Sequence, residues 1–133
     1  MTQNFVAKPV SYDTLEKHSF IVATSGGILM GTPVKLDTNG KVVTATSLAL
    51  AIGIVDNMPD YRAENETGTV ALGDAAQVVL FGKTFQGLSG GTFSKSQYLD
   101  ITTGTLTYSA SATDAIALDA STAAGQLCRY MVK

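Results

Sequence analysis

The sequence is poor in the residues on which most protein chemistry depends. Its 133 residues include one cysteine, one histidine and no tryptophan. The single cysteine, Cys128, excludes an internal disulfide, and one histidine with one cysteine cannot complete a closed zinc site. Cys128 lies in an apolar run near the C-terminus, and we interpret it as a small buried residue rather than a nucleophile.

Charge is also scarce. Nine lysines and arginines against eleven acidic residues give a formal net charge of −2, and the basic residues are scattered singly. Binding to nucleic acid or to an anionic membrane needs a concentrated positive patch, so we expect neither as a partner. No apolar run approaches the length of a transmembrane helix, and residues 1–10 lack the pattern of a signal peptide. These absences predict a protein made in the cytoplasm.

Fragments that match catalytic motifs lack the surroundings that those motifs require. Gly82-Lys83-Thr84 matches the end of a phosphate-binding P-loop, but Gln77 stands where the first glycine belongs and no helix start follows. Residues 87–91 match the letters of a nucleophile elbow without an α/β pattern around them. Because no general acid, base and oxyanion site come together, we predict a non-enzyme without cofactor or metal.

The remaining polar and aromatic residues have plainer interpretations. His18 is either a general base or metal ligand or, as we favour, a surface residue near a helix end. Segment 56–68 predicts a solvated loop, because its acids match no ordered calcium loop; these acids are Asp56, Asp60, Glu64 and Glu66. The aromatic residues of the second half are expected to pack the core rather than form a sugar-binding platform; they are Phe81, Phe85, Phe93, Tyr98 and Tyr108.

The order of turns and short apolar segments predicts an all-β chain. Asn39-Gly40 is a strong hairpin signal because both residues tolerate positive φ, and strands are expected at 33–36 and 41–46 around it. Residues 51–55 are apolar on both faces, which is typical of a central strand. Further strands are expected at 20–23, 76–81 and 126–132. This spacing predicts a small single-domain β-barrel or β-tulip-like sandwich with at most one short helix.

Part of the chain recurs. Segment 31–55 has a weaker copy at 96–119, in which Leu36 aligns with Leu99 and one residue is inserted before the second glycine. This weak internal repeat indicates that one β-module is used twice in a single compact unit. We therefore divide the chain into an N-terminal arm with its lead-in, 1–24, and a single β-domain, 25–133.

The first residues have the composition of an extended arm. Lys8 precedes Pro9, which favours extended backbone. Residues 11–18 form either one helical turn, with Asp13 as N-cap and Glu16 three residues later, or coil. Such an arm can add a strand to an open sheet edge, and the alternative is a disordered terminus. The candidate contacts to a capsid or a neighbouring subunit are Phe5, Val6, Pro9, Val10 and Tyr12.

The central module has the form G-x-x-V-x-L-D-x-x-G-x-V-x-x-A, followed after a small-residue link by A-I-G-I-V. The positions that carry the pattern are Gly31, Val34, Leu36, Asp37, Gly40, Val42, Ala45 and Ile52-Gly53-Ile54-Val55. Ala124-Gly125, before the closing strand, adds to the likeness. From about Ser25 onward the chain resembles the decoration proteins of tailed-bacteriophage capsids, also called head stabilisation or cement proteins.

The resemblance implies both a fold and a function. It implies a β-barrel or β-tulip fold that binds the outside of an assembled capsid as a homotrimer, with the major capsid protein as partner. The protein would then be made in the host cytoplasm and reside on the virion exterior. Binding the assembled shell rather than its free subunits would stabilise the shell by mass action, and a trimer would add avidity. The alternative is a β-barrel binding module of a phage tail or fibre that recognises a carbohydrate or receptor.

Overall fold

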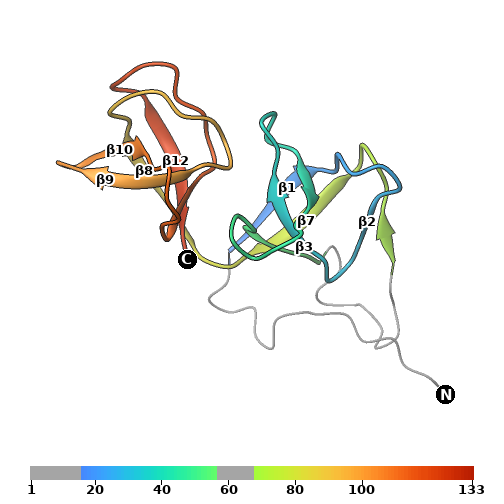
Figure 1. Ribbon diagram of the computed structural model, residues 1–133. Coiled ribbons are helices and arrows are strands. Elements are labelled where there is room, and N and C mark those ends of the chain that lie inside the picture. Colours follow the sequence, from blue (N-terminus) through green and yellow to red (C-terminus); the bar gives the residue numbers. More distant parts are fainter. Residues whose placement is uncertain (1–15, 57–67) are drawn as a thin grey trace.

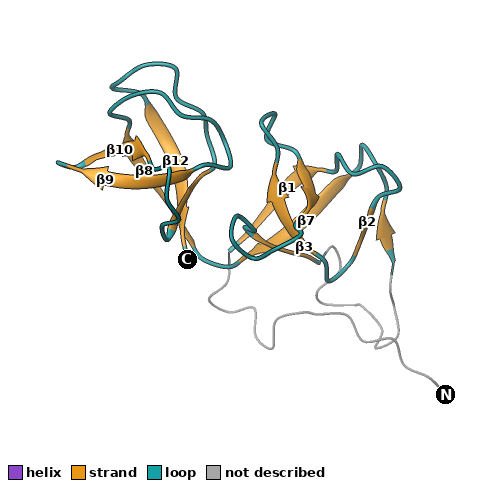
Figure 2. Ribbon diagram, in the orientation of Figure 1, coloured by secondary structure: helices purple, strands orange, loops and turns teal. Residues whose placement is uncertain are grey.

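The computed structural model describes residues 16–56 and 68–133, and this part of the chain is all-β without a helix (Figures 1 and 2). The predicted fold class, a small all-β sandwich, is therefore confirmed. Residues 17 and 18 lie in a strand, so the helical turn considered for 11–18 does not reach them, and its first part lies outside the described residues. The strands are β1 (Lys17–Ile21), β2 (Ile28–Leu29), β3 (Pro33–Leu36), β4 (Val42–Thr44), β5 (Gly53–Val55), β6 (Thr69–Val70), β7 (Ala75–Leu80), β8 (Lys83–Leu88), β9 (Tyr98–Thr102), β10 (Thr105–Tyr108), β11 (Ala115–Ala117) and β12 (Leu127–Val132).

The described strands form two lobes, which Figure 1 shows on either side of the short connection between β7 and β8. The first lobe is the sheet β1-β7-β5-β3-β4 with the small sheet β2-β6, and the second lobe is the sheet β10-β9-β11-β12-β8. All strand pairs in these sheets are antiparallel. Strand β1 begins inside segment 1–24, which the sequence analysis assigned to the arm and its lead-in.

The two lobes repeat one strand topology. In each lobe the first strand pairs with the last, the second long strand forms a hairpin with the third, and the fourth strand lies between the second and the last. The pair β3–β5 joins Val34 to Gly53, and its counterpart β9–β11 joins Leu99 to Ala115. Even the small sheet β2-β6 has a counterpart, the isolated bridge between Phe93 and Ser121. We call these two units the first and second repeat.

Each repeat curls until its edge strands meet at one point. A single parallel bridge joins Val22 to Val42 in the first repeat and Ser89 to Leu106 in the second. The N–H of the following residue then donates to the same partner carbonyl, from Ala23 at 2.9 Å and from Gly90 at 2.7 Å. One bridge is not a hydrogen-bonded ladder, so neither described sheet closes into a complete barrel.

The registers correct the sequence alignment of the repeat. Leu36 lies opposite Val42, whereas Ile101 lies opposite Leu106, so Leu36 corresponds to Ile101 and not to Leu99. The second hairpin is one residue shorter, and it turns through Thr103 (φ 49°) and Gly104 (φ 82°). This is the two-residue turn with two positive φ angles that favours hairpins.

The first hairpin uses a different turn from the one expected at Asn39-Gly40. Only Gly40 has a positive φ, of 78°, and the Asp37 carboxylate accepts the N–H groups of Asn39 and Lys41, each at 2.9 Å. This side-chain bonding within the loop is typical of aspartate in turns. The hairpin itself is present, with β3 and β4 as its strands.

The two repeats share a hydrophobic core. Ile116, Leu118 and Met131 of the second repeat belong to the core cluster of the first, where Ile52 and Leu80 are also buried. A second cluster lies inside the curl of the second repeat and contains Phe93, Leu99, Leu106, Ala115, Ala117 and Cys128. Since burial of such side chains stabilises by about 1.5–3 kcal/mol each, the contact between the repeats is part of the fold. Within the described residues no helix is long and apolar enough to cross a membrane.

Candidate functional site

The structure does not describe the contact residues that we proposed from the sequence. Phe5, Val6, Pro9, Val10 and Tyr12 all lie outside the described residues. The described surface instead offers an open hollow, and sequence reasoning missed it because its lining comes from both repeats.

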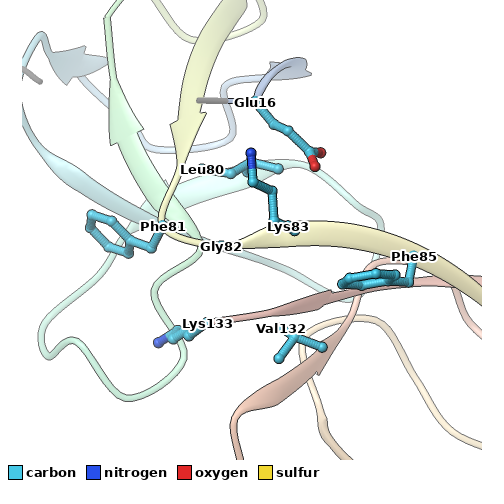
Figure 3. Close-up of a pocket in the computed structure, with 8 residues that line it drawn as sticks. All are labelled: Glu16, Leu80, Phe81, Gly82, Lys83, Phe85, Val132 and Lys133. Carbon is cyan, nitrogen blue, oxygen red and sulfur yellow. The ribbon is translucent and has the colours of Figure 1, made fainter. Parts of the chain in front are cut away.

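The hollow lies at the connection between β7 and β8 and has a volume of about 450 Å³. Figure 3 shows its lining, which comes from the start of β1, the end of β7, the start of β8 and the end of β12. Four apolar side chains and three charged ones surround Gly82. The lining residues are Glu16, Leu80, Phe81, Gly82, Lys83, Phe85, Val132 and Lys133.

Six of these residues are repeat-equivalent pairs. The carbonyl of Glu16 accepts the N–H of Leu80 at 2.9 Å, and in the second repeat Lys83 lies opposite Val132 in the same way. The next residues along, Phe81 and Lys133, likewise donate to equivalent carbonyls. The hollow is therefore built from one set of positions used twice, and the two copies differ in charge: Glu16 occupies the position of Lys83, and Phe81 occupies the position of Lys133.

Glu16 fastens the two repeats together at this point. Its carboxylate accepts the main-chain N–H of Thr84 at 3.1 Å and the Thr84 hydroxyl at 2.5 Å. The hydroxyl bond, followed by the main-chain bond, holds the pKa of Glu16 below its usual value, and His18 at 3.5 Å adds a smaller effect in the same direction. The Glu16 carboxylate is consequently ionised at neutral pH and engaged in structure.

Lys133 is also engaged. Its ammonium donates to the main-chain carbonyls of Leu48 at 2.7 Å and Ala49 at 3.1 Å. Burial lowers the pKa of Lys133, and the nearby carboxylate of Asp114 opposes that shift in part. Lys133 therefore connects the segment after β12 to the loop before β5, and its ammonium group is bound to carbonyls of that loop.

The aromatic residues beside the hollow are exposed. Phe81 is 43% exposed and Phe85 is 50% exposed, although the Phe85 ring packs at a tilt against Tyr130, with ring centroids 5.8 Å apart. The expectation that the aromatics of the second half pack the core is wrong for these two residues and for Tyr108. It holds for Phe93, which is buried.

A second apolar feature lies farther along β8. Leu88 and Leu127 face each other across β8 and β12, and they are 51% and 62% exposed. The position of Leu88 corresponds to that of Ile21 in the first repeat, which is also exposed. These residues lie beside the edge of the second sheet, and exposed strand edges pair with other chains.

The other residues considered for chemistry occupy structural places. Lys83 and Thr84 begin strand β8, and Ser89 is buried with its hydroxyl donating to the carbonyl of Ala123 at 2.9 Å. Cys128 is buried as predicted, and burial raises the pKa of its thiol. His18 lies in β1, not near a helix end. Across residues 16–56 and 68–133, no group of three or more histidine, cysteine or acidic side chains is placed to hold a metal ion.

We compared the chain with protein-family models, curated proteins and solved structures. No protein-family model, no curated protein and no solved structure matches the chain.

Proposed function

We propose that the protein is a structural component of a phage particle: a decoration protein that binds the outer surface of the assembled capsid and stabilises it. The observation that supports this most is the internal duplication. A chain with two copies of one β-module offers two related surfaces, and a capsid offers a regular array of related surfaces to receive them. The motif likeness around Gly31–Val55 points to the same class of protein.

The duplication gives a physical reason for preferring an assembled shell. A chain that contacts two neighbouring capsid subunits gains effective concentration for its second contact, and this gain is absent on a free subunit. A homotrimer would carry six copies of the module around its three-fold axis. Preferential binding of the assembled state stabilises that state by mass action.

The surface chemistry suits a contact between closely packed proteins. The net charge is only −2, so neighbouring copies repel one another little. The exposed apolar residues Ile21 and Leu88 occupy equivalent places in the two repeats. We infer that these twin positions contribute to the surface that meets the major capsid protein, with no enzymatic step, nucleic acid or membrane involved.

Quantitative mass spectrometry of purified virus particles tests this function. Trypsin should release residues 42–62, VVTATSLALAIGIVDNMPDYR, as a reporter. We expect this peptide in amounts comparable with those of the major shell protein. Particles that lack the protein should also release their DNA at a lower temperature. Complete absence of the peptide from particles would overturn the proposal.

One observation favours a second function, a carbohydrate- or receptor-binding module of a tail or fibre. The lining of the hollow includes two exposed aromatic residues, Phe81 and Phe85, together with the acidic residue Glu16, and sugar sites combine such groups. In that case particles would contain only a few copies, and Phe85→Ala would reduce binding in a glycan array. Tyr108→Ala, at another exposed aromatic residue, is the matched control.

A further inference from the structure

The edge of β8 that faces away from β12 combines outward main-chain groups at Gln86 with the exposed apolar side chain of Phe85. Among the described strands, β8 is the last in its sheet and forms a hydrogen-bonded ladder only with β12, while β10 approaches its far end. The single bridge from Ser89 to Leu106 lies beyond its end. The part of this edge around Gln86 lies between the Glu16 contact at Thr84 and the bridge at Ser89. An exposed strand edge is a template for another extended segment.

The direction of the main-chain groups can be followed along β8. The N–H of Ser89 donates to the carbonyl of Gln126 in the turn that leads into β12, so alternate residues from Phe85 onward face β12. Thr84 and Gln86 therefore direct their main-chain groups away from β12. The outward N–H of Thr84 is taken by Glu16. The outward groups of Gln86 face the open edge.

We propose that this edge, together with the hollow beside it, binds the N-terminal segment 1–15 of a second copy of the chain as an added strand. The proposal rests on the proposed function in one respect, the homotrimer, and it supplies the contact that would hold that trimer together. An arm that leaves one copy and docks on β8 of the next makes a head-to-tail contact, and a head-to-tail contact whose rotation is 120° closes into a trimeric ring.

The place where segment 1–15 joins the fold supports this occupant. Glu16 lines the hollow, and its carboxylate accepts the main-chain N–H of Thr84 at the start of this edge of β8. Fifteen residues of extended chain reach at most about 50 Å, which is enough to span from one copy to the same edge of a neighbour. The segment also carries the apolar side chains Phe5, Val6 and Val10 for the apolar lining.

The corresponding edge of the first repeat explains why the second is the docking site. There β1 carries His18 at the position of Phe85 and Ser19 at the position of Gln86. Polar and charged side chains on an edge strand discourage pairing with another chain. At β8 the exposed Phe85 instead offers apolar surface next to the outward main-chain groups of Gln86.

The test is a photo-crosslinking experiment on the full-length protein. A photoreactive phenylalanine replaces Phe5, and equal amounts of ¹⁴N- and ¹⁵N-labelled protein are mixed in denaturant and refolded together before irradiation. We expect crosslinks from position 5 to residues 81–88, with about half of them joining a light to a heavy chain. Crosslinks confined to chains of one label would show that the arm binds its own copy, and crosslinks elsewhere would show that β8 is not the site.

Matched variants sharpen the test. Gln86→Pro removes an outward N–H without touching the ladder to β12, because proline is tolerated on the open side of an edge strand. We expect it to reduce the crosslink at least tenfold, whereas Ser19→Pro, at the equivalent place on β1, should leave the yield unchanged. Should Gln86→Pro fail to fold, the arm variant with Phe5 photoreactive and Val6→Asp gives the same expectation. Equal crosslinking in all variants would overturn the proposal.

The outcome is separable from that of the proposed function. Crosslinks between copies together with absence from virus particles would retain the arm exchange and discard the decoration role. Abundant protein on particles without any crosslink at β8 would retain the decoration role and discard the arm exchange.

Discussion

The Glu16 carboxylate accepts both the main-chain N–H and the hydroxyl of Thr84. Glu16 immediately precedes β1, the first strand of the first repeat, and Thr84 lies in β8, the first strand of the second. The bond joins positions 68 residues apart in the sequence. It therefore links the entrance of β1 to the entrance of β8 independently of the main chain that connects β7 to β8.

Stability should fall in acid through Glu16. The pKa of this carboxyl is lowered in the folded protein, so its contribution is present above its usual pKa of about 4.5 and is lost as pH falls through the lower folded value. We expect the melting temperature of the wild type to decline more steeply below pH 5 than that of Glu16→Gln. Thermal unfolding between pH 3 and pH 7 measures this difference, and parallel curves for the two proteins would contradict it.

Gly40→Val should destabilise the protein by more than about 1 kcal/mol, because a β-branched residue resists a positive φ. The φ of Gly40 is 78°, and an added Cβ would lie 2.6 Å from the ammonium of Lys95. Gly91→Ala is the control, since nothing lies within 4 Å of its added Cβ and its φ is not positive. Chemical unfolding measures the free energy of unfolding of both variants. Equal values would contradict the view that the positive φ of Gly40 contributes to stability.

Gly53→Ala should cost about 1–3 kcal/mol through overpacking. An added Cβ would lie 2.1 Å from the carbonyl oxygen of Val79, which is main chain and cannot move aside alone. The equivalent residue of the second repeat is Ala115, so the same substitution is accepted in one repeat and resisted in the other. Denaturation midpoints decide the matter: a variant as stable as the wild type would show that β5 shifts to make room.

Met131→Ala should destabilise by about 2–5 kcal/mol, as buried large-to-small changes do. Met131 is fully buried, and although it belongs to the second repeat it lies in the core cluster of the first. We expect faster amide exchange in β5 and β7 as well as in β12, because the lost packing is shared. Faster exchange limited to the second repeat would show that the repeats unfold separately.

Much of the fold could be predicted from local sequence signals. The hairpin after Pro33–Leu36, the apolar strand that ends at Val55 and the closing strand all lie where turn residues and apolar runs indicate. These elements depend on neighbours in the sequence, and such neighbours are visible in a single chain. The all-β class follows from the same signals.

The pairing of distant strands could not be predicted in this way. In each repeat the first strand pairs with the last, and β1 and β8 share too little sequence for the equivalence of Phe20 with Gly87, or of His18 with Phe85, to be visible. The candidate site was missed for a related reason. Phe81 ends an apolar run that indicates a buried strand, but β7 stops at Leu80 and the next residue lies at the rim of the hollow.

The repeated topology also bears on how the chain reaches its native state. The first repeat is complete only when β1 pairs with β7, which lies far along the sequence, and such long-range pairing is slow. By the time β8 follows, it carries the same pairing geometry as β1, and the two strands can compete for β7. Exchange of equivalent strands is a characteristic failure of duplicated modules. The divergence between β1 and β8, in which His18 takes the place of Phe85, reduces that competition, so the dissimilarity that hides the duplication also helps each strand to find its own partner.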